Sequence, residues 1–105
     1  MQIVNLRTAI DQGPDRQVEP LFDGPRRKLV QITLRNGAVL SAHKATSPIT
    51  IQCLAGVGTL RAIEETIQLR PGVLATLDAN VVHEITAEPA VTFLLTKFTS
   101  ESGSA

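Results

Sequence analysis

Two histidines and one cysteine are the side chains of this chain best suited to hold a metal or to move a proton. His43 and His83 are the only histidines, and Cys53 is the only cysteine. A first-row divalent metal held tightly by a protein normally has three or more protein ligands. Two imidazoles without a carboxylate therefore predict a weak site of low charge, and a third ligand would have to come from elsewhere in the chain.

The segment around Cys53 is expected to be a strand that contributes to the same site. Strict alternation places Ile49, Ile51 and Cys53 on one face and Gln52 on the other. If Ile49 faces the interior, Cys53 also points inward and Gln52 points away, unless a β-bulge reverses the order. A thiolate beside two imidazoles would suit zinc or iron. In the alternative interpretation Cys53 is a small buried apolar residue and Gln52 a hydrogen-bonding residue of the sheet.

Composition and turn residues predict an all-β domain. The chain has 105 residues, is 43% hydrophobic and only 3% aromatic, and its apolar runs are rich in the β-branched residues that suit strands. Pro20 predicts an edge strand, and Asn36-Gly37 predicts a two-residue hairpin. Ten short strands at this spacing indicate a sandwich or barrel, and we expect them at 1–6, 17–22, 27–35, 38–43, 47–58, 59–63, 66–70, 73–77, 81–87 and 90–98.

Two stretches around the histidines resemble the motifs of the cupin family. The first runs from Gly37 through His43 to Gly56, and the second runs from Gly72 to His83. The spacings match those of the two cupin motifs. The resemblance implies a double-stranded β-helix, that is, a jelly-roll barrel of about nine or ten strands, formed by one domain at 1–98. The small, polar residues at 99–105 predict a flexible tail.

The sequence departs from the cupin pattern at two of the four metal-ligand positions. Ala45 stands where the first motif has its second histidine, and Ile49 stands where it has a glutamate. Only His43 and His83 remain as candidate metal ligands, for zinc, iron, nickel or manganese. Asp78 and Asn80 replace a proline and a glycine of the second motif and suit the same tight turn. We expect Ala45 and Ile49 to widen and dry the pocket.

Three functions are compatible with this pattern. The first is binding of a small organic molecule in the barrel pocket, with no reaction assigned. The second is a metal-dependent oxygenase or isomerase with a reduced ligand set, and the third is a dimeric structural or interaction module. Sugar epimerases of the cupin fold use a tyrosine as the acid. This chain has no Tyr and therefore lacks the acid that such an epimerase needs. The predicted ligand-binding residues are His43, Ile49, Ile51, Gln52, Cys53, His83 and Phe93. In the alternative interpretation Phe93 is a core residue, which is the commoner role of such a phenylalanine.

The net charge and the N-terminal residues limit the classes of partner and the compartment that we expect. Ten basic residues balance ten acidic ones, and this balance argues against binding of nucleic acid or anionic membranes, which needs a basic surplus. The N-terminal residues lack the apolar stretch of a signal peptide, and a single cysteine is typical of a reducing compartment. We therefore expect a cytoplasmic homodimer that binds a small molecule.

Overall fold

The computed structural model describes residues 1–99 and contains strands and turns without a helix in that range. The all-β prediction is therefore confirmed. Of the tail predicted at 99–105, all but Thr99 lies outside the described residues. The strands are β1 (Arg16–Asp23), β2 (Arg27–Leu34), β3 (Val39–His43), β4 (Ile49–Ala62), β5 (Glu65–Leu69), β6 (Leu74–Leu77) and β7 (His83–Phe98).

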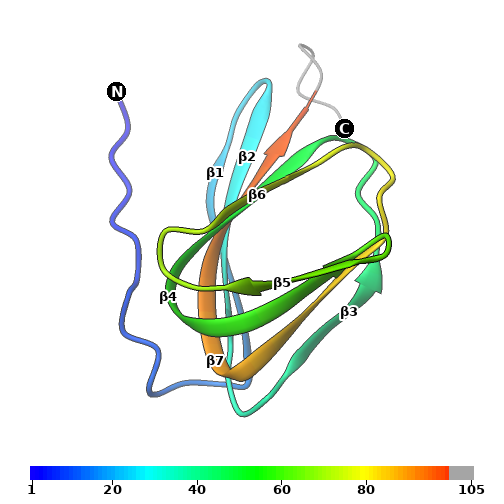
Figure 1. The fold of residues 1–105 in the computed structure, drawn as a ribbon. Coiled ribbons are helices and arrows are strands. Elements are labelled where there is room, and N and C mark those ends of the chain that lie inside the picture. The colour runs from blue at the N-terminus through cyan, green and yellow to red at the C-terminus, as the bar shows by residue number, and fades with distance from the viewer. Residues whose placement is uncertain (100–105) are drawn as a thin grey trace.

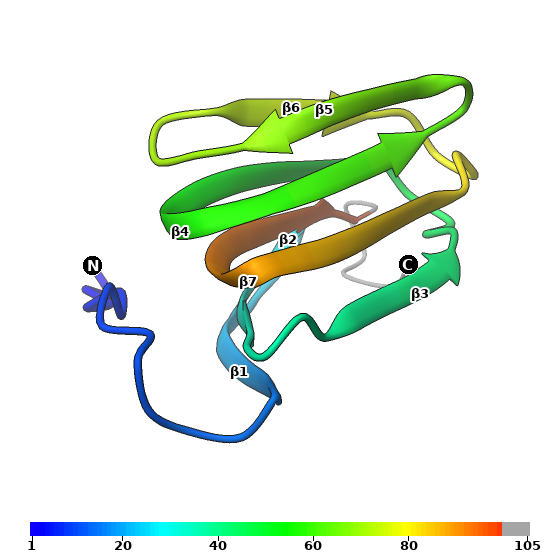
Figure 2. The ribbon, with the colours of Figure 1, turned by 60° about the horizontal axis from the view of Figure 1, so that its bottom comes forward.

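Two long strands, β4 and β7, hold the fold together because each belongs to two layers (Figure 1). The first half of β4 pairs with β6 and with the second half of β7, which also pairs with β2. The second half of β4 pairs with β5 and with the first half of β7, which also pairs with β3. One layer is thus β1-β2-β7-β4-β6 and the other is β3-β7-β4-β5. Figure 2 shows β4 and β7 curving from one layer into the other.

The bend of β4 occurs where its pairing with β7 shifts register. The shifts lie between Cys53 and Ala55 and between Gly56 and Gly58, and β-bulges of this kind sharpen the local bend of a strand. Gly56 has φ 79°, a conformation that glycine adopts without steric cost. A Cβ at this position would lie 2.2 Å from the Ala90 carbonyl oxygen on β7. Glycine is therefore required for β7 to pass this close.

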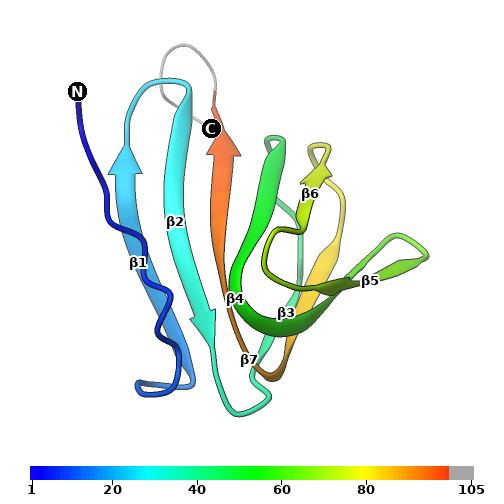
Figure 3. The ribbon, with the colours of Figure 1, turned by 60° about the vertical axis from the view of Figure 1, so that its left-hand side comes forward.

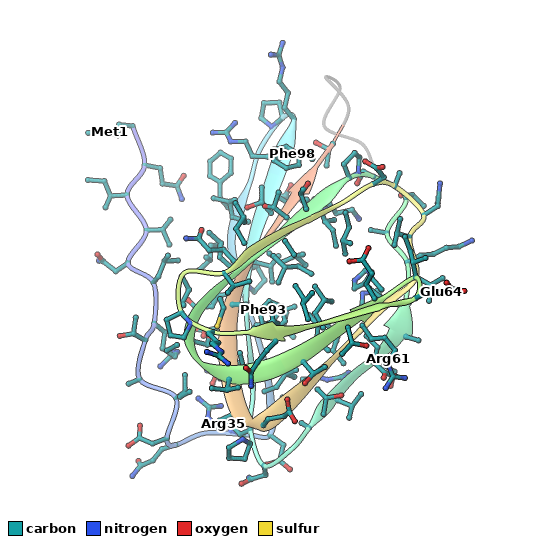
Figure 4. The ribbon with its side chains drawn as sticks, in the orientation of Figure 1. Met1, Arg35, Arg61, Glu64, Phe93 and Phe98 are labelled. Carbon is teal, nitrogen blue, oxygen red and sulfur yellow. The ribbon has the colours of Figure 1, made fainter. Side chains whose placement is uncertain are left out.

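The core lies between the two layers. The inward faces of the strands meet there, and Figure 4 shows Phe93 inside the ring formed by the strands. Full burial of each large aliphatic or aromatic side chain stabilises the fold by roughly 1.5–3 kcal/mol. The buried apolar residues are Ile32, Leu34, Ile49, Ile51, Cys53, Leu60, Leu69, Ile85, Ala87, Val91 and Phe93.

The strand predicted at 1–6 is wrong, because that segment is extended but makes no ladder. It lies beside the first layer (Figure 3) and is held by side chains instead. The Gln31 amide accepts from the Arg7 backbone N at 2.9 Å and donates to the Arg7 carbonyl at 2.6 Å. Arg35 donates to the carbonyls of Ile10 and Pro14 at 2.9 and 2.8 Å. We call residues 1–15 the N-terminal arm.

Two further expectations about strands need correction. Residues 1–99 form seven strands rather than nine or ten, because the segments predicted separately at 47–58 and 59–63, and at 81–87 and 90–98, are continuous through the bends. Asn36 and Gly37 have the positive φ values of 56° and 70° that a tight turn uses. They do not close a hairpin, however, since β2 and β3 each pair with a different part of β7.

Other expectations are confirmed. The strand that contains Pro20 is β1, at the edge of its layer. The segments predicted as strands at 59–63 and 66–70 pair in the β4–β5 hairpin, with Glu64 in its turn. In residues 1–99 no helix is long and apolar enough to cross a membrane. The single domain at 1–98, the homodimer and the cytoplasmic location stay predictions.

Replacing Gly56 by alanine tests whether close approach at the bend holds the two layers together. We expect Gly56→Ala to lower the free energy of unfolding by more than about 3 kcal/mol, because the new methyl group collides with backbone rather than with a movable side chain. Gly37→Ala is the control: its φ is also positive, but a Cβ there meets nothing within 4 Å, so it should cost only about 1–2 kcal/mol. Equal losses in urea-unfolding experiments would contradict this account.

Candidate functional site

The fold brings the two histidines into contact. His43, the last residue of β3, pairs with His83, the first residue of β7, and their ring centroids are 4.3 Å apart with an interplanar angle of 57°. The segments that follow and precede them are also tied together, since the Asn80 backbone N donates to the Ala45 carbonyl at 2.7 Å. His83 is 3% exposed, whereas His43 is exposed. We call these two side chains the histidine pair.

Hydrogen bonds to the backbone set the tautomer of both rings. His43 Nδ1 lies 2.8 Å from the Ser41 carbonyl oxygen, and His83 Nδ1 lies 3.0 Å from the Val81 carbonyl oxygen. A carbonyl oxygen only accepts, so each Nδ1 must carry the proton. In the neutral ring Nε2 then has the free lone pair, and neither Nε2 makes a hydrogen bond within the described part of the chain. The pair therefore offers two acceptor nitrogens.

Burial favours the neutral form of His83. Loss of water around the ring lowers the pKa of His83 below its ordinary 6.5, and the neighbouring His43 lowers that pKa further. The hydrogen bond to the Val81 carbonyl opposes both effects but is smaller than the effect of burial. At neutral pH His83 is thus an uncharged imidazole, the state that accepts a hydrogen bond or binds a metal.

A row of cross-strand neighbours extends from the histidine pair. His83 pairs with Ala62 on β4, and Ala62 pairs with Glu65 on β5. Directly paired residues of an antiparallel sheet point to the same face, so His43, His83, Ala62 and Glu65 share the face that looks toward the other layer. The Glu65 carboxylate accepts hydrogen bonds as the two Nε2 atoms do. The row is consequently rich in acceptors.

An aliphatic cleft of about 230 Å³ adjoins this row. It lies where β5 and β6, the edge strands of the two layers, face one another across the barrel (Figure 1). We call it the inter-layer cleft. Its lining is aliphatic except for one carboxylate and one hydroxyl: Leu60, Ala62, Ile63, Glu65, Ile67, Ala75, Thr76 and Leu77.

A second cleft, of about 450 Å³, includes His83 in its lining. We call it the outer cleft. It contains a loose ion pair, in which Arg61 Nη1 lies 3.9 Å from Glu84 Oε1. Figure 4 shows Arg61 near the end of the β4–β5 hairpin, with Glu64 close by. The outer cleft is lined by Ala42, Arg61, Ile63, Asn80, Val81, Val82, His83 and Glu84.

The structure separates the other predicted site residues from the histidine pair. The expected alternation on β4 is correct, since Ile49, Ile51 and Cys53 are buried and Gln52 is exposed. These three and Phe93 fill the core and line neither cleft. Gln52 is on the outer face, so the structure does not bring it to the pair.

Cys53 does not supply a third metal ligand. It pairs with Phe93, in the half of β7 that belongs to the other layer, and burial raises the pKa of its thiol. It is therefore a protonated core residue at neutral pH. In residues 1–99 no third His, Cys, Asp or Glu joins the two histidines to form a group able to hold a metal.

The residues replacing the cupin ligands do not widen the pocket as expected. Ile49 is 3% exposed inside the apolar core, and Ala45 packs against that core. They fill space where the motif has polar ligands, so the clefts lie nearer the β4–β5 hairpin.

Apart from His83, the residues that line the two clefts were not predicted from the sequence, above all Ile63, Glu65 and Arg61. The sequence predicted the strands that contain Arg61 and Glu65. It did not show which edge strands enclose a cleft, because that depends on the pairing of β4 with β7. Ile63 carried a signal, since a β-branched residue in a two-residue hairpin turn is unusual.

Comparison with solved structures identifies the architecture. A cupin superfamily protein from Desulfitobacterium hafniense superposes with a TM-score of 0.77 at 15% identity, covering 92% of this chain and 84% of that one. An RmlC-like cupin with a double-stranded β-helix fold from Methanocaldococcus jannaschii gives 0.75 at 16%, covering 96% of both chains. The chain has the cupin fold. An RmlC-like cupin from Shewanella frigidimarina gives 0.76 at 16%, covering 84% of this chain and 79% of that one.

Comparison of the sequence alone gives no match to a known protein family. The sequence matches no profile of a known protein family, and it matches no curated protein. The likeness of the cupin structures is thus a likeness of backbone, and the function has to be argued from the residues of this chain.

The lowered pKa of His83 predicts a loss of stability in mild acid. An unfolded His83 takes up its proton near pH 6.5 and the folded one only at lower pH, so the unfolded state binds more protons between the two pKa values. The free energy of unfolding should be fully retained above about pH 6.5 and should fall as the pH drops through the folded pKa, by at most about 1.4 kcal/mol per pH unit. His83→Gln should lack this component. Parallel stability curves for wild type and variant between pH 7.5 and 5 would contradict the assignment.

Proposed function

We propose that this cupin domain binds a small aliphatic alcohol or amine between its two layers. The observation that carries the proposal is the histidine pair, whose Nδ1 protons are bound to backbone carbonyls, so that both Nε2 atoms are left as acceptors. Ala62, the cross-strand neighbour of His83, lines the aliphatic inter-layer cleft. A hydroxyl or amine group of the ligand would donate to Nε2, and its carbon chain would lie against Leu60, Ile67 and Leu77. Sites of this type combine apolar walls with a few polar anchors.

Electrostatics favours a neutral or positively charged donor over an anion. The Glu65 carboxylate shares the face of the histidine pair, and burial keeps His83 uncharged. A carboxylate ligand would meet acceptors where it needs donors. The proposal is one of binding, and it assigns no reaction.

Calorimetric titration with 1,2-hexanediol and with hexanoate tests the proposal. We expect the diol to bind and hexanoate to bind at least tenfold more weakly at pH 7.5. His43→Ala should weaken diol binding about five- to tenfold, the cost of a lost hydrogen bond of roughly 1–1.5 kcal/mol. His43 is exposed, so this variant should keep its fold.

Gln52→Ala is the matched control, because Gln52 is also exposed and polar but lies on the outer face of β4. It should bind the diol as wild type does. Equal binding of diol and hexanoate, or equal effects of the two variants, would refute the proposed mode.

A metal-dependent enzyme is the second candidate, favoured by the same two Nε2 atoms. Imidazole nitrogens bind zinc, iron, nickel and manganese, and a metal on the histidine pair would supply Lewis-acid chemistry with open coordination positions. The fit is partial, since residues 1–99 add no third ligand to the pair.

Metal content measured by mass spectrometry on tag-free protein distinguishes the two candidates. If the chain binds an organic molecule through hydrogen bonds, both wild type and His83→Ala should contain well below one metal per chain. About one zinc, iron, nickel or manganese ion per chain in wild type, lost in His83→Ala, would favour the metal-dependent enzyme instead.

A further inference from the structure

Ile63 adopts a backbone conformation that its side chain opposes. It is the first of two residues that connect β4 to β5, and its φ is 58°. Positive φ is rare for any residue with a Cβ, and for a β-branched side chain it is a true outlier. Gly, Asn and Asp are the residues that such turns normally use. Two of the other non-glycine residues with positive φ in this chain, Asn36 and Asn80, follow that rule.

The fold gains little from the Ile63 side chain. Ile63 is 78% exposed, and it does not belong to the apolar core or to the residues packed against it. Strain of this kind persists where the surroundings impose it and gathers at ligand-binding positions. An exposed isoleucine also leaves apolar surface in water, which Asn or Gly in the same turn would not.

The position of Ile63 connects it with the proposed site. It lines both the inter-layer cleft and the outer cleft, and it is the one residue common to their linings. Its neighbour Ala62 pairs directly with His83, and Ala62 also pairs with Glu65. The Ile63 side chain therefore stands at the rim between the two clefts, close to the row of cross-strand neighbours that contains the histidine pair and Glu65.

We propose that Ile63 is a specificity-determining residue that contacts the aliphatic chain of the ligand at the rim. The inference rests on the proposed function and adds a selection by length. A ligand whose donor group binds the histidine pair and whose chain is too long for the inter-layer cleft extends past the rim and covers Ile63, whereas a shorter one stays within the cleft. Covering an exposed isoleucine with a carbon chain is favourable in proportion to the apolar area removed from water.

The test compares Ile63→Asn with wild type in two measurements, thermal unfolding and binding of 1,2-butanediol and 1,2-octanediol. Relief of the positive φ should raise Tm by about 3–6 °C. The same substitution should weaken binding of 1,2-octanediol about five- to tenfold and change binding of 1,2-butanediol less than twofold. A stabilised protein with impaired binding of the longer diol is the result that a purely structural role would not produce.

Arg26→Asn is the control for a positive φ at a position away from both clefts. Arg26 has φ 76° in the turn between β1 and β2 and lines neither cleft, so this variant should bind both diols as wild type does. If Ile63→Asn leaves Tm unchanged, or raises it while 1,2-octanediol binds as before, the role of Ile63 is overturned and the proposed function stands. Failure of wild type to bind either diol overturns the proposed function and this inference with it.

Discussion

The pairing of β4 with β7 is the constraint on which the rest of this structure depends. The two strands stay paired with one another from Ile49 to Ala62, so that both layers share the same two strands. Because the two strands bend together, β2, β3, β5 and β6 each find their place by pairing with one half of them, and β1 then pairs with β2. The bend leaves no room for a side chain at Gly56, and one glycine thus supports both the packing of the core and the site at the far end of the ladder.

The same ladder places the histidine pair. His83 begins β7 and Ala62 ends β4, so their pairing is the last step of the ladder and lies at its open end. Rings further along β7 would be sealed in the core, as Phe93 is at 0% exposed. At the open end an imidazole is desolvated enough to stay neutral, while the neighbouring His43 remains in contact with solvent. The position within the ladder therefore sets the protonation state of His83.

The outer face of the first layer shows why polar residues at alternate positions need not face water. Gln31, Thr33 and Thr92 are at most 1% exposed. Thr33 Oγ1 and Thr92 Oγ1 lie 2.8 Å apart, and Gln31 donates to the same Thr92 oxygen at 2.8 Å. The amide of Gln31 also binds the backbone of the arm as another peptide group would. Buried polar groups are tolerated when they are hydrogen-bonded, so this stripe fastens the arm without an additional strand.

These features separate what the sequence could predict from what it could not. Strand positions and turn chemistry follow from local patterns, and the motifs around His43 and His83 correctly indicated the cupin fold. Pairing is not local: the turn at Asn36-Gly37 was recognised, but its strands pair with β7 because β7 offers both of them a longer partner. For the same reason the alternation of β4 correctly placed Ile49 and Cys53 inside, yet it could not show that they lie in the core rather than in a cleft.

Ile49 and Ile63 together explain where a ligand site can exist in this barrel. A carboxylate at the position of Ile49 would be buried among aliphatic side chains, where an unpaired charge is strongly unfavourable. Such a carboxylate would therefore destabilise the fold unless a bound metal balanced its charge. With isoleucine there, 3% exposed, the fold gains apolar burial in the interior and needs no metal to balance a charge. The polar acceptors that remain are at the rim, and there the chain keeps an isoleucine in a conformation that favours glycine. Ile49 fills the interior, and Ile63 stands in a strained conformation at the rim. The candidate site therefore lies at the end of the β4–β5 hairpin rather than at the centre of the barrel.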